Sequence, residues 1–253
     1  MTLPFKEPDE DTRHRNGTYF VSVGRYERAL SCFERAVKED PIAVHSWISL
    51  AYCLDRLGRS METVHAADRA LALDPSHLDA LFTRAKALFH LGQLEEAIQL
   101  LLTVVRLDRG HAEGWYVMGN CHYHLGHYEP AIECYRHAIE INPTFVKAWY
   151  NKGINYADLN RFEDAIRCYD RCLSSNPSYA AVWNSKGIAL TNLDSWEEAV
   201  TCFERSLAIN PRDASAWMNM GRCLRHLKRD NEAEECFAQA RKLPRRHELA
   251  DIF

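Results

Sequence analysis

Hydrophobic residues recur along this chain at helical spacing, in blocks that repeat every 34 residues. Apolar side chains follow one another at steps of three and four, which places them on one face of an α-helix. The clearest marker is a ladder of tryptophans, each 34 residues from the next: Trp115, Trp149, Trp183 and Trp217. Trp47 lies two periods before Trp115, and Leu81 occupies the place between them. A fixed period of this length is typical of a chain built from stacked copies of one small unit.

Each unit contains two predicted helices whose facing residues differ in size. With the ladder tryptophan at position 4, positions 4, 7, 8 and 11 share one helical face, and positions 20, 24 and 27 share another. Position 8 is small: Gly17, Ala51, Ala85, Gly119, Gly153, Gly187 and Gly221. Position 20 is small as well: Ala29, Thr63, Ala97, Ala131, Ala165, Ala199 and Ala233. Position 24 is apolar or aromatic: Phe33, Ala67, Leu101, Tyr135, Tyr169, Phe203 and Phe237. The small residues let the two helices approach, and the large ones fill the remaining space.

Turn-forming residues separate these helices. Position 15 ends the first helix with residues that tolerate a left-handed conformation: Gly24, Gly58, Gly92, Gly126, Asn160 and Asp194. Lys228 breaks this column in the last unit. Position 32 is proline in five units, which stops the second helix: Pro41, Pro75, Pro143, Pro177 and Pro211.

These columns closely resemble the tetratricopeptide repeat (TPR), and the resemblance covers residues 10 to about 243. The fourth unit, AEGWYVMGNCHYHLGHYEPAIECYRHAIEINP, is near the family consensus throughout, while other units depart from it at Arg13, Leu81 and Arg109. The resemblance implies an all-α fold, a right-handed α-solenoid of about seven TPR helix-turn-helix units. We expect a single array over residues 10–245, with an N-terminal tail at 1–9 and a short C-terminal tail at 246–253. The expected units are 10–43, 44–77, 78–111, 112–145, 146–179, 180–213 and 214–245.

Composition and charge argue against several classes of function. A net charge of −4 argues against bulk binding of nucleic acid, which needs cations to neutralise phosphates. No apolar run approaches the ~20 residues of a membrane helix, and the acidic N-terminus lacks the apolar stretch of a signal peptide. We therefore expect a cytoplasmic protein. We also expect no catalytic domain, because few residues lie outside the array.

Several cysteines and histidines are candidate metal ligands. Eight of the nine cysteines fall at positions 10 and 23, and Cys172 falls at position 27, a register that indicates packing. Cys168 and Cys172 could begin a metal site, but no second ligand pair is evident at zinc-site spacing. Cys121 with His124 could do the same, but the histidines of this unit are expected to point different ways, with His122 in the core, His124 in the groove and His127 in the turn between the helices. Phosphate loops, GxGxxG and HExxH motifs are absent from the sequence. We expect no metal, no cofactor and no enzymatic activity.

The resemblance also implies that the first helices line a concave groove, which in this family commonly holds a partner's extended or helical peptide. Aromatic candidates for this groove are Tyr52, Phe82, Phe89, Tyr116, Tyr123 and Tyr150. Polar candidates beside them are Lys86, Asn120, Asn151, Asn184 and Asn219. Rings can anchor side chains, and amides can bond an extended backbone. The alternative is that the position-5 tyrosines pack between units.

Two observations bear on the kind of partner. Some relatives hold a chaperone's C-terminal carboxylate with two asparagines and three cations; here Asn120 and Asn151 match, but the cations are missing. We predict no such clamp. The last unit is locally basic, with cations that include Arg222, Arg225 and Arg241. These are either solvated helix faces or a surface for an acidic segment or a second copy.

The sequence thus predicts a non-catalytic scaffold or adaptor that binds a protein or peptide partner in its groove. The alternative is a structural subunit of a larger assembly, or a self-associating protein, that uses its ends and edges. Repeat arrays also occur in enzymes and RNA-binding proteins, and these classes would need further sequence or more positive charge. Neither the partner nor the oligomeric state follows from the sequence.

Overall fold

The computed structural model describes residues 10–243, with side chains from His14 onward, so both predicted tails, 1–9 and 246–253, lie outside the described residues. This part of the chain is entirely α-helical. Its helices are α1 (Glu10–Ser22), α2 (Tyr26–Glu39), α3 (Val44–Arg56), α4 (Ser60–Leu73), α5 (Leu78–His90), α6 (Leu94–Leu107), α7 (Ala112–His124), α8 (Tyr128–Ile141), α9 (Val146–Asp158), α10 (Phe162–Ser175), α11 (Ala180–Asn192), α12 (Trp196–Ile209), α13 (Ala214–His226) and α14 (Asp230–Lys242).

Each of the seven sequence repeats supplies two consecutive helices, in phase with the repeat. Every odd-numbered helix begins at position 1 of its unit, and every even-numbered helix begins at position 17. The predicted all-α solenoid of TPR helix pairs is therefore confirmed.

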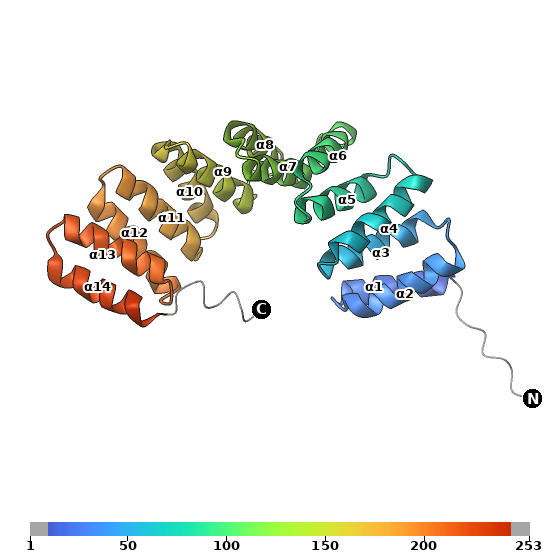
Figure 1. Cartoon of the computed structure of the whole chain (residues 1–253), viewed down its shortest axis with the longest axis horizontal. Helices are drawn as coiled ribbons and strands as arrows, with labels where there is room; N and C mark the ends of the chain where they lie inside the picture. The colour runs from blue at the N-terminus through green and yellow to red at the C-terminus, as the bar shows by residue number, and fades with distance from the viewer. Residues whose placement is uncertain (1–9, 244–253) are drawn as a thin grey trace, which may run out of the picture. The chain divides into compact units, whose positions relative to one another are not determined.

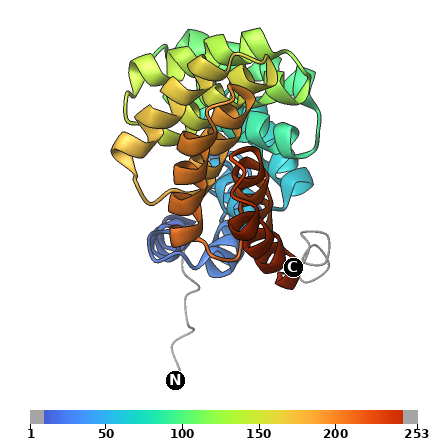
Figure 2. The ribbon, with the colours of Figure 1, turned by 90° about the vertical axis from the view of Figure 1, so that its left-hand side faces the viewer.

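The helices are grouped in two compact units: α1–α7 lie in the unit that ends at Leu125, and α8–α14 lie in the unit that begins at Gly126. In the first unit, α1, α3, α5 and α7 contact one another in succession, so the first helices of neighbouring pairs share one face (Figure 1). In the second unit, α9, α11 and α13 do the same. Figure 2 shows the last pair, α13 and α14, in dark red. The prediction of a single continuous array over 10–245 stays a prediction.

The turn inside each pair depends on one residue with positive φ. Glycine takes this conformation at Gly24, Gly58, Gly92 and Gly126, with φ of 72–76°. Asn160, Asp194 and Lys228 take it in the last three pairs, with φ of 57°, 55° and 59°. Lys228 therefore departs from the column in residue type but not in backbone conformation. A lysine is costly in this region, since its Cβ crowds the following carbonyl.

Close approach inside the pairs explains the small residues at position 8. A Cβ built on Gly187 would lie 2.6 Å from the Phe203 ring, and one on Gly153 would lie 2.5 Å from the Tyr169 ring. Where position 8 is alanine, as at Ala51, position 24 is not aromatic. The two columns therefore compensate for each other in volume.

Four of the ladder tryptophans tie their helix pair to the proline before it. The indole Nε1–H of Trp183 donates a hydrogen bond to the carbonyl of Pro177 at 2.8 Å. Trp47, Trp149 and Trp217 make the same bond to the proline six residues earlier, at 2.9, 3.0 and 3.0 Å. The ladder thus fixes the position of the loop between pairs, in addition to filling space.

The cysteines are packing residues, as their register predicts. Eight are buried thiols, and Cys32 in the first pair is half-buried. Burial raises the pKa of the Cys53 and Cys121 thiols from 9.0 to about 12, because the charged thiolate loses its hydration. The interior therefore holds these side chains as neutral apolar groups.

Candidate functional site

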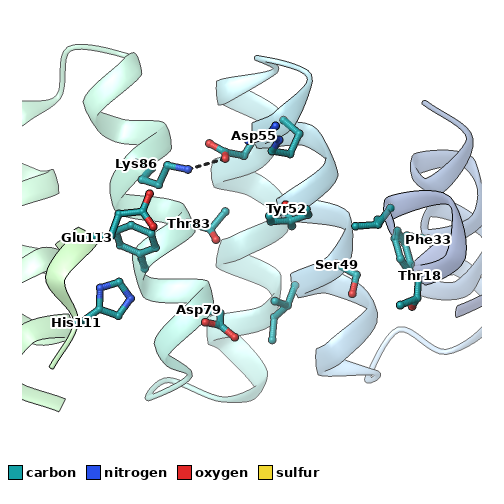
Figure 3. A pocket seen from close by; sticks show the side chains of 14 residues that line it. Thr18, Phe33, Ser49, Tyr52, Asp55, Asp79, Thr83, Lys86, His111 and Glu113 are labelled. Atoms are coloured by element: carbon teal, nitrogen blue, oxygen red, sulfur yellow. Dashed lines mark hydrogen bonds and ion pairs between the residues drawn. The ribbon is translucent and has the colours of Figure 1, made fainter. Parts of the chain in front are cut away.

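A hollow of about 530 Å³ lies on the shared face of the first helices in the first unit (Figure 3). Its walls come mainly from α1, α3, α5 and the beginning of α7. The lining residues are Thr18, Val21, Phe33, Ile48, Ser49, Tyr52, Asp55, Arg56, Asp79, Phe82, Thr83, Lys86, His111 and Glu113. Three of the predicted groove residues, Tyr52, Phe82 and Lys86, are brought together here.

Aromatic rings occupy two places in the hollow. Tyr52 is 41% exposed, and its ring meets that of Tyr26 edge-on with 6.4 Å between centroids. Phe82 lies against the His111 ring at 4.6 Å. Tyr26 supports the Tyr52 ring on one side, while much of the Tyr52 surface stays exposed. Tyr52 is therefore suited to anchor a side chain of a bound partner.

The cations of the hollow are engaged with groups of the protein itself. Lys86 Nζ lies 2.9 Å from Asp55 Oδ2, and the Asp55 side chain is only 8% exposed. The Arg56 guanidinium lies 5.2 Å from the centre of the Tyr26 ring. Lys86 was predicted as a polar contact for a partner, but its charge is already balanced by Asp55. The hollow is therefore a weak site for a carboxylate.

Two carboxylates face the hollow without an ion pair to any residue in the described part of the chain. Asp79 lies in the first turn of α5 and Glu113 in the first turn of α7, and both are exposed. His111 precedes α7 and caps it, with Nδ1 accepting from the Gly114 backbone N–H at 2.9 Å. Figure 3 shows Asp79, His111 and Glu113 around one end of the hollow. This end favours a cationic group on a ligand.

The other predicted residues of the first unit lie outside this hollow. Phe89 contacts the ring of the exposed His124 at 5.5 Å, and Tyr123 contacts the same ring at 5.5 Å. Tyr116 and Asn120 are half-buried on α7. These four residues belong to α5 and α7 but do not line the cavity.

The predicted residues of the second unit are more strongly involved in packing. Tyr150 contacts the rings of Tyr179 and Tyr169 at 5.5 and 6.0 Å, and its hydroxyl lies 3.2 Å from Ser185 Oγ. Asn151, Asn184 and Asn219 are half-buried. Asn151 accepts a bond from the buried Asn155 amide through its backbone carbonyl, at 2.8 Å. Packing between pairs thus accounts for much of the Tyr150 environment.

The acidic residues of the hollow were not among the predicted groove residues. Asp79 and Glu113 stand at position 2 of neighbouring sequence repeats, and Asp55 stands at position 12 of the repeat before them. Position 12 also holds the predicted groove residues Phe89 and Tyr123, and position 2 lies three residues before the position of Phe82, on the same helical face. This charge could therefore have been found by reading those two columns for acids as well as for aromatics.

Comparison with protein-family models supports the TPR fold. Residues 74–251 match the family model described as "Cilia and flagella-associated protein 70 C-terminal domain", a TPR family. The chain belongs to this family. Residues 22–104 also match the model for anaphase-promoting complex, cyclosome, subunit 3. No curated protein gives a significant match to the sequence.

Solved structures resemble the chain at low sequence identity. A tetratricopeptide repeat protein from Parabacteroides merdae ATCC 43184 has a TM-score of 0.69 at 18% identity, covering 96% of each chain. MamA has a TM-score of 0.61 at 24% identity, covering 68% of this chain and 93% of its own. YrrB, described as a TPR protein with an unusual peptide-binding site, has 0.62 at 19%, covering 78% of this chain and 97% of its own. These likenesses support the TPR fold.

Two further properties concern the described residues alone. Residues 10–243 bring no three His, Cys, Asp or Glu side chains together as a metal ion would require. None of the helices in the same range has the length and apolar character needed to span a membrane.

Proposed function

We propose that this protein is a non-catalytic TPR scaffold that binds a protein segment in the Tyr52–Phe82 hollow of its first unit. The observation that carries the proposal is the supported, exposed Tyr52 ring inside a cavity of about 530 Å³ on the shared face of α1, α3, α5 and α7. YrrB, a TPR protein of similar fold, is described as having a peptide-binding site. Nine free thiols suit a reducing compartment, and we propose a cytoplasmic location.

The charges in the hollow favour a particular kind of segment. Lys86 and Asp55 neutralise each other, while Asp79 and Glu113 remain available to a ligand. A segment that places an apolar side chain on Tyr52 and a lysine or arginine near Asp79 would satisfy both features. We still predict that the chain has no chaperone clamp and binds no nucleic acid. Both predictions agree with the free carboxylates of the hollow, Asp79 and Glu113.

The proposal can be tested with peptides selected from a random displayed library on the full chain. For the selected peptides, the double variant Tyr52→Ala/Phe82→Ala should bind at least about tenfold more weakly, because truncating buried interface aromatics commonly removes more than about 1.4 kcal/mol. Fluorescence anisotropy gives the affinities, and circular dichroism checks the helicity.

Tyr19→Ala is the matched control, since Tyr19 is an exposed tyrosine of the same unit that does not line the hollow. Its affinities should equal those of the unchanged chain. Retained affinity in the double variant, with normal helicity, would refute the site. Tyr150 is a poorer choice for such a test, because its truncation would also disturb packing around α9 and α11.

A second candidate function is that of a structural subunit in a larger assembly. The match of residues 22–104 to a subunit model of the anaphase-promoting complex favours it. Light scattering can distinguish a peptide-binding scaffold from a structural subunit. It is applied to the purified chain and to the complex recovered from the native cell. A stoichiometric complex insensitive to Tyr52→Ala/Phe82→Ala would favour the subunit.

A further inference from the structure

A second hollow, of about 340 Å³, lies on the last helix pair and has a different chemistry from the first. It is lined by Met218, Arg222, Arg225, Phe237 and Arg241. Met218, Arg222 and Arg225 follow one another at steps of four and three on α13, so they share one face. Phe237 and Arg241 are four residues apart on α14. Two helix faces thus converge on an apolar floor surrounded by arginines.

The floor of this hollow is unusually open for its place in the repeat. Position 24 is fully buried in other pairs, with Phe33, Tyr169 and Phe203 at most 1% exposed. Phe237, at the same position, is half-buried, and Met218 is 39% exposed. An aliphatic side chain of a ligand could therefore be covered by Met218 and Phe237.

The charges around this floor are unbalanced. Arg225 Nη2 lies 2.9 Å from Glu234 Oε1, and Arg241 Nη2 lies 3.8 Å from the other oxygen of the same carboxylate. Arg222 is exposed and has no carboxylate partner in the described part of the chain. Two of the three guanidinium groups therefore share one carboxylate, and the third is left without one. Arg225 is also held 4.7 Å from the centre of the Phe237 ring.

We propose that this hollow, the α13–α14 arginine pocket, binds an acidic segment of a protein partner. An aliphatic or aromatic side chain of the segment occupies the space between Met218 and Phe237. A neighbouring carboxylate pairs with Arg222, whose planar fork can bind both oxygens at once. A polypeptide suits the pocket better than nucleic acid does, because its floor is apolar and the whole chain carries a charge of −4.

The test uses the full chain and a short fluorescein-labelled peptide, in which leucine and phenylalanine are flanked on both sides by runs of glutamate. Arg222→Glu should weaken binding at least about tenfold, because it removes an attractive pair and adds repulsion. Arg212→Glu is the matched control, an exposed arginine outside the pocket in the same compact unit, and should change affinity less than about twofold. Replacing the two apolar residues of the probe by serine should weaken binding about fivefold or more.

Several outcomes would overturn the proposal. One is equal affinity in Arg222→Glu, or in the milder Arg222→Gln if the first variant loses helicity. Another is an oligouridine that binds with the same Arg222 dependence while the serine probe keeps full affinity, which would indicate a site for any polyanion. A third is a chain that light scattering shows to self-associate through Arg222 and that excludes the probe. Tyr52→Ala/Phe82→Ala should leave this affinity unchanged, so the two proposals fail separately.

Discussion

The Cys53 thiol shows how one repeated position contributes to stability. It is fully buried on α3, and desolvation, with a smaller contribution from Cys32, raises its pKa from 9.0 to about 12. The unfolded chain ionises this thiol near pH 9, whereas the folded chain keeps it neutral. Its stabilising effect is therefore complete below pH 9 and is lost as the pH rises from 9 towards 12.

We expect this thiol to steepen the alkaline loss of stability by up to about 1.4 kcal/mol for each pH unit above 9. Urea unfolding of the chain and of Cys53→Ala, at several pH values between 8 and 11, measures the difference in slope. The variant starts from a lower stability but should lose less of it with pH. Parallel slopes would show that the ionisation of Cys53 is not coupled to folding.

For individual residues, the sequence predicted burial of side chains better than it predicted their partners. The cysteine register was enough to predict burial, because packing at a repeated position follows from the fold of every unit. The pairing of Lys86 with Asp55 was not predictable in this way. It joins residues 31 apart, on two helices of different pairs, and depends on where each flexible side chain points. The same holds for Tyr150, whose contacts with Tyr179 and Ser185 cross from one pair to the next.

Within a helix pair, volume is balanced between position 8 of the first helix and position 24 of the second. Gly187 lies against Phe203 in α11 and α12, leaving no space for a methyl group. We expect Gly187→Ala to lower the free energy of unfolding by about 1–3 kcal/mol, through overpacking against the ring. Chemical denaturation with circular dichroism measures this change.

The compensating variant makes this test specific. In the pair α5–α6, Ala85 at position 8 faces Leu101 at position 24, so Gly187→Ala/Phe203→Leu copies a combination that the chain already uses. The double variant should be more stable than the sum of the two single changes predicts. Additive effects would mean that the glycine is required for another reason, such as helix geometry.

Element boundaries were the most predictable part of the structure. Helix starts follow the repeat because the tryptophan, the small residues and the turn residue recur at fixed separations. The hollows were not predictable as cavities. Their depth depends on which side chains leave space unfilled, as at Tyr52, or stay only half-buried, as at Phe237.

Within each compact unit, contacts run almost entirely between helices that are adjacent in the sequence, so stability should be local. Trp183 illustrates this: its indole bonds Pro177, and it lies under the side chains of Lys186 and Arg205. We expect Trp183→Phe to cost about 1 kcal/mol, mainly through loss of the hydrogen bond. Hydrogen exchange should quicken in α10–α12, while α1–α5 keep their protection. Faster exchange throughout the chain would show instead that the pairs unfold as one cooperative body.

The buried thiols have a consequence for how long the folded chain survives. Opening of any helix pair except α5–α6 exposes at least one cysteine, which, once ionised, attacks disulfides and reacts with oxidants. Under oxidising conditions a brief opening can thus become a permanent cross-link. The lifetime of the protein there would be set by the frequency of such openings rather than by its equilibrium stability. In a reducing environment the same openings simply close again.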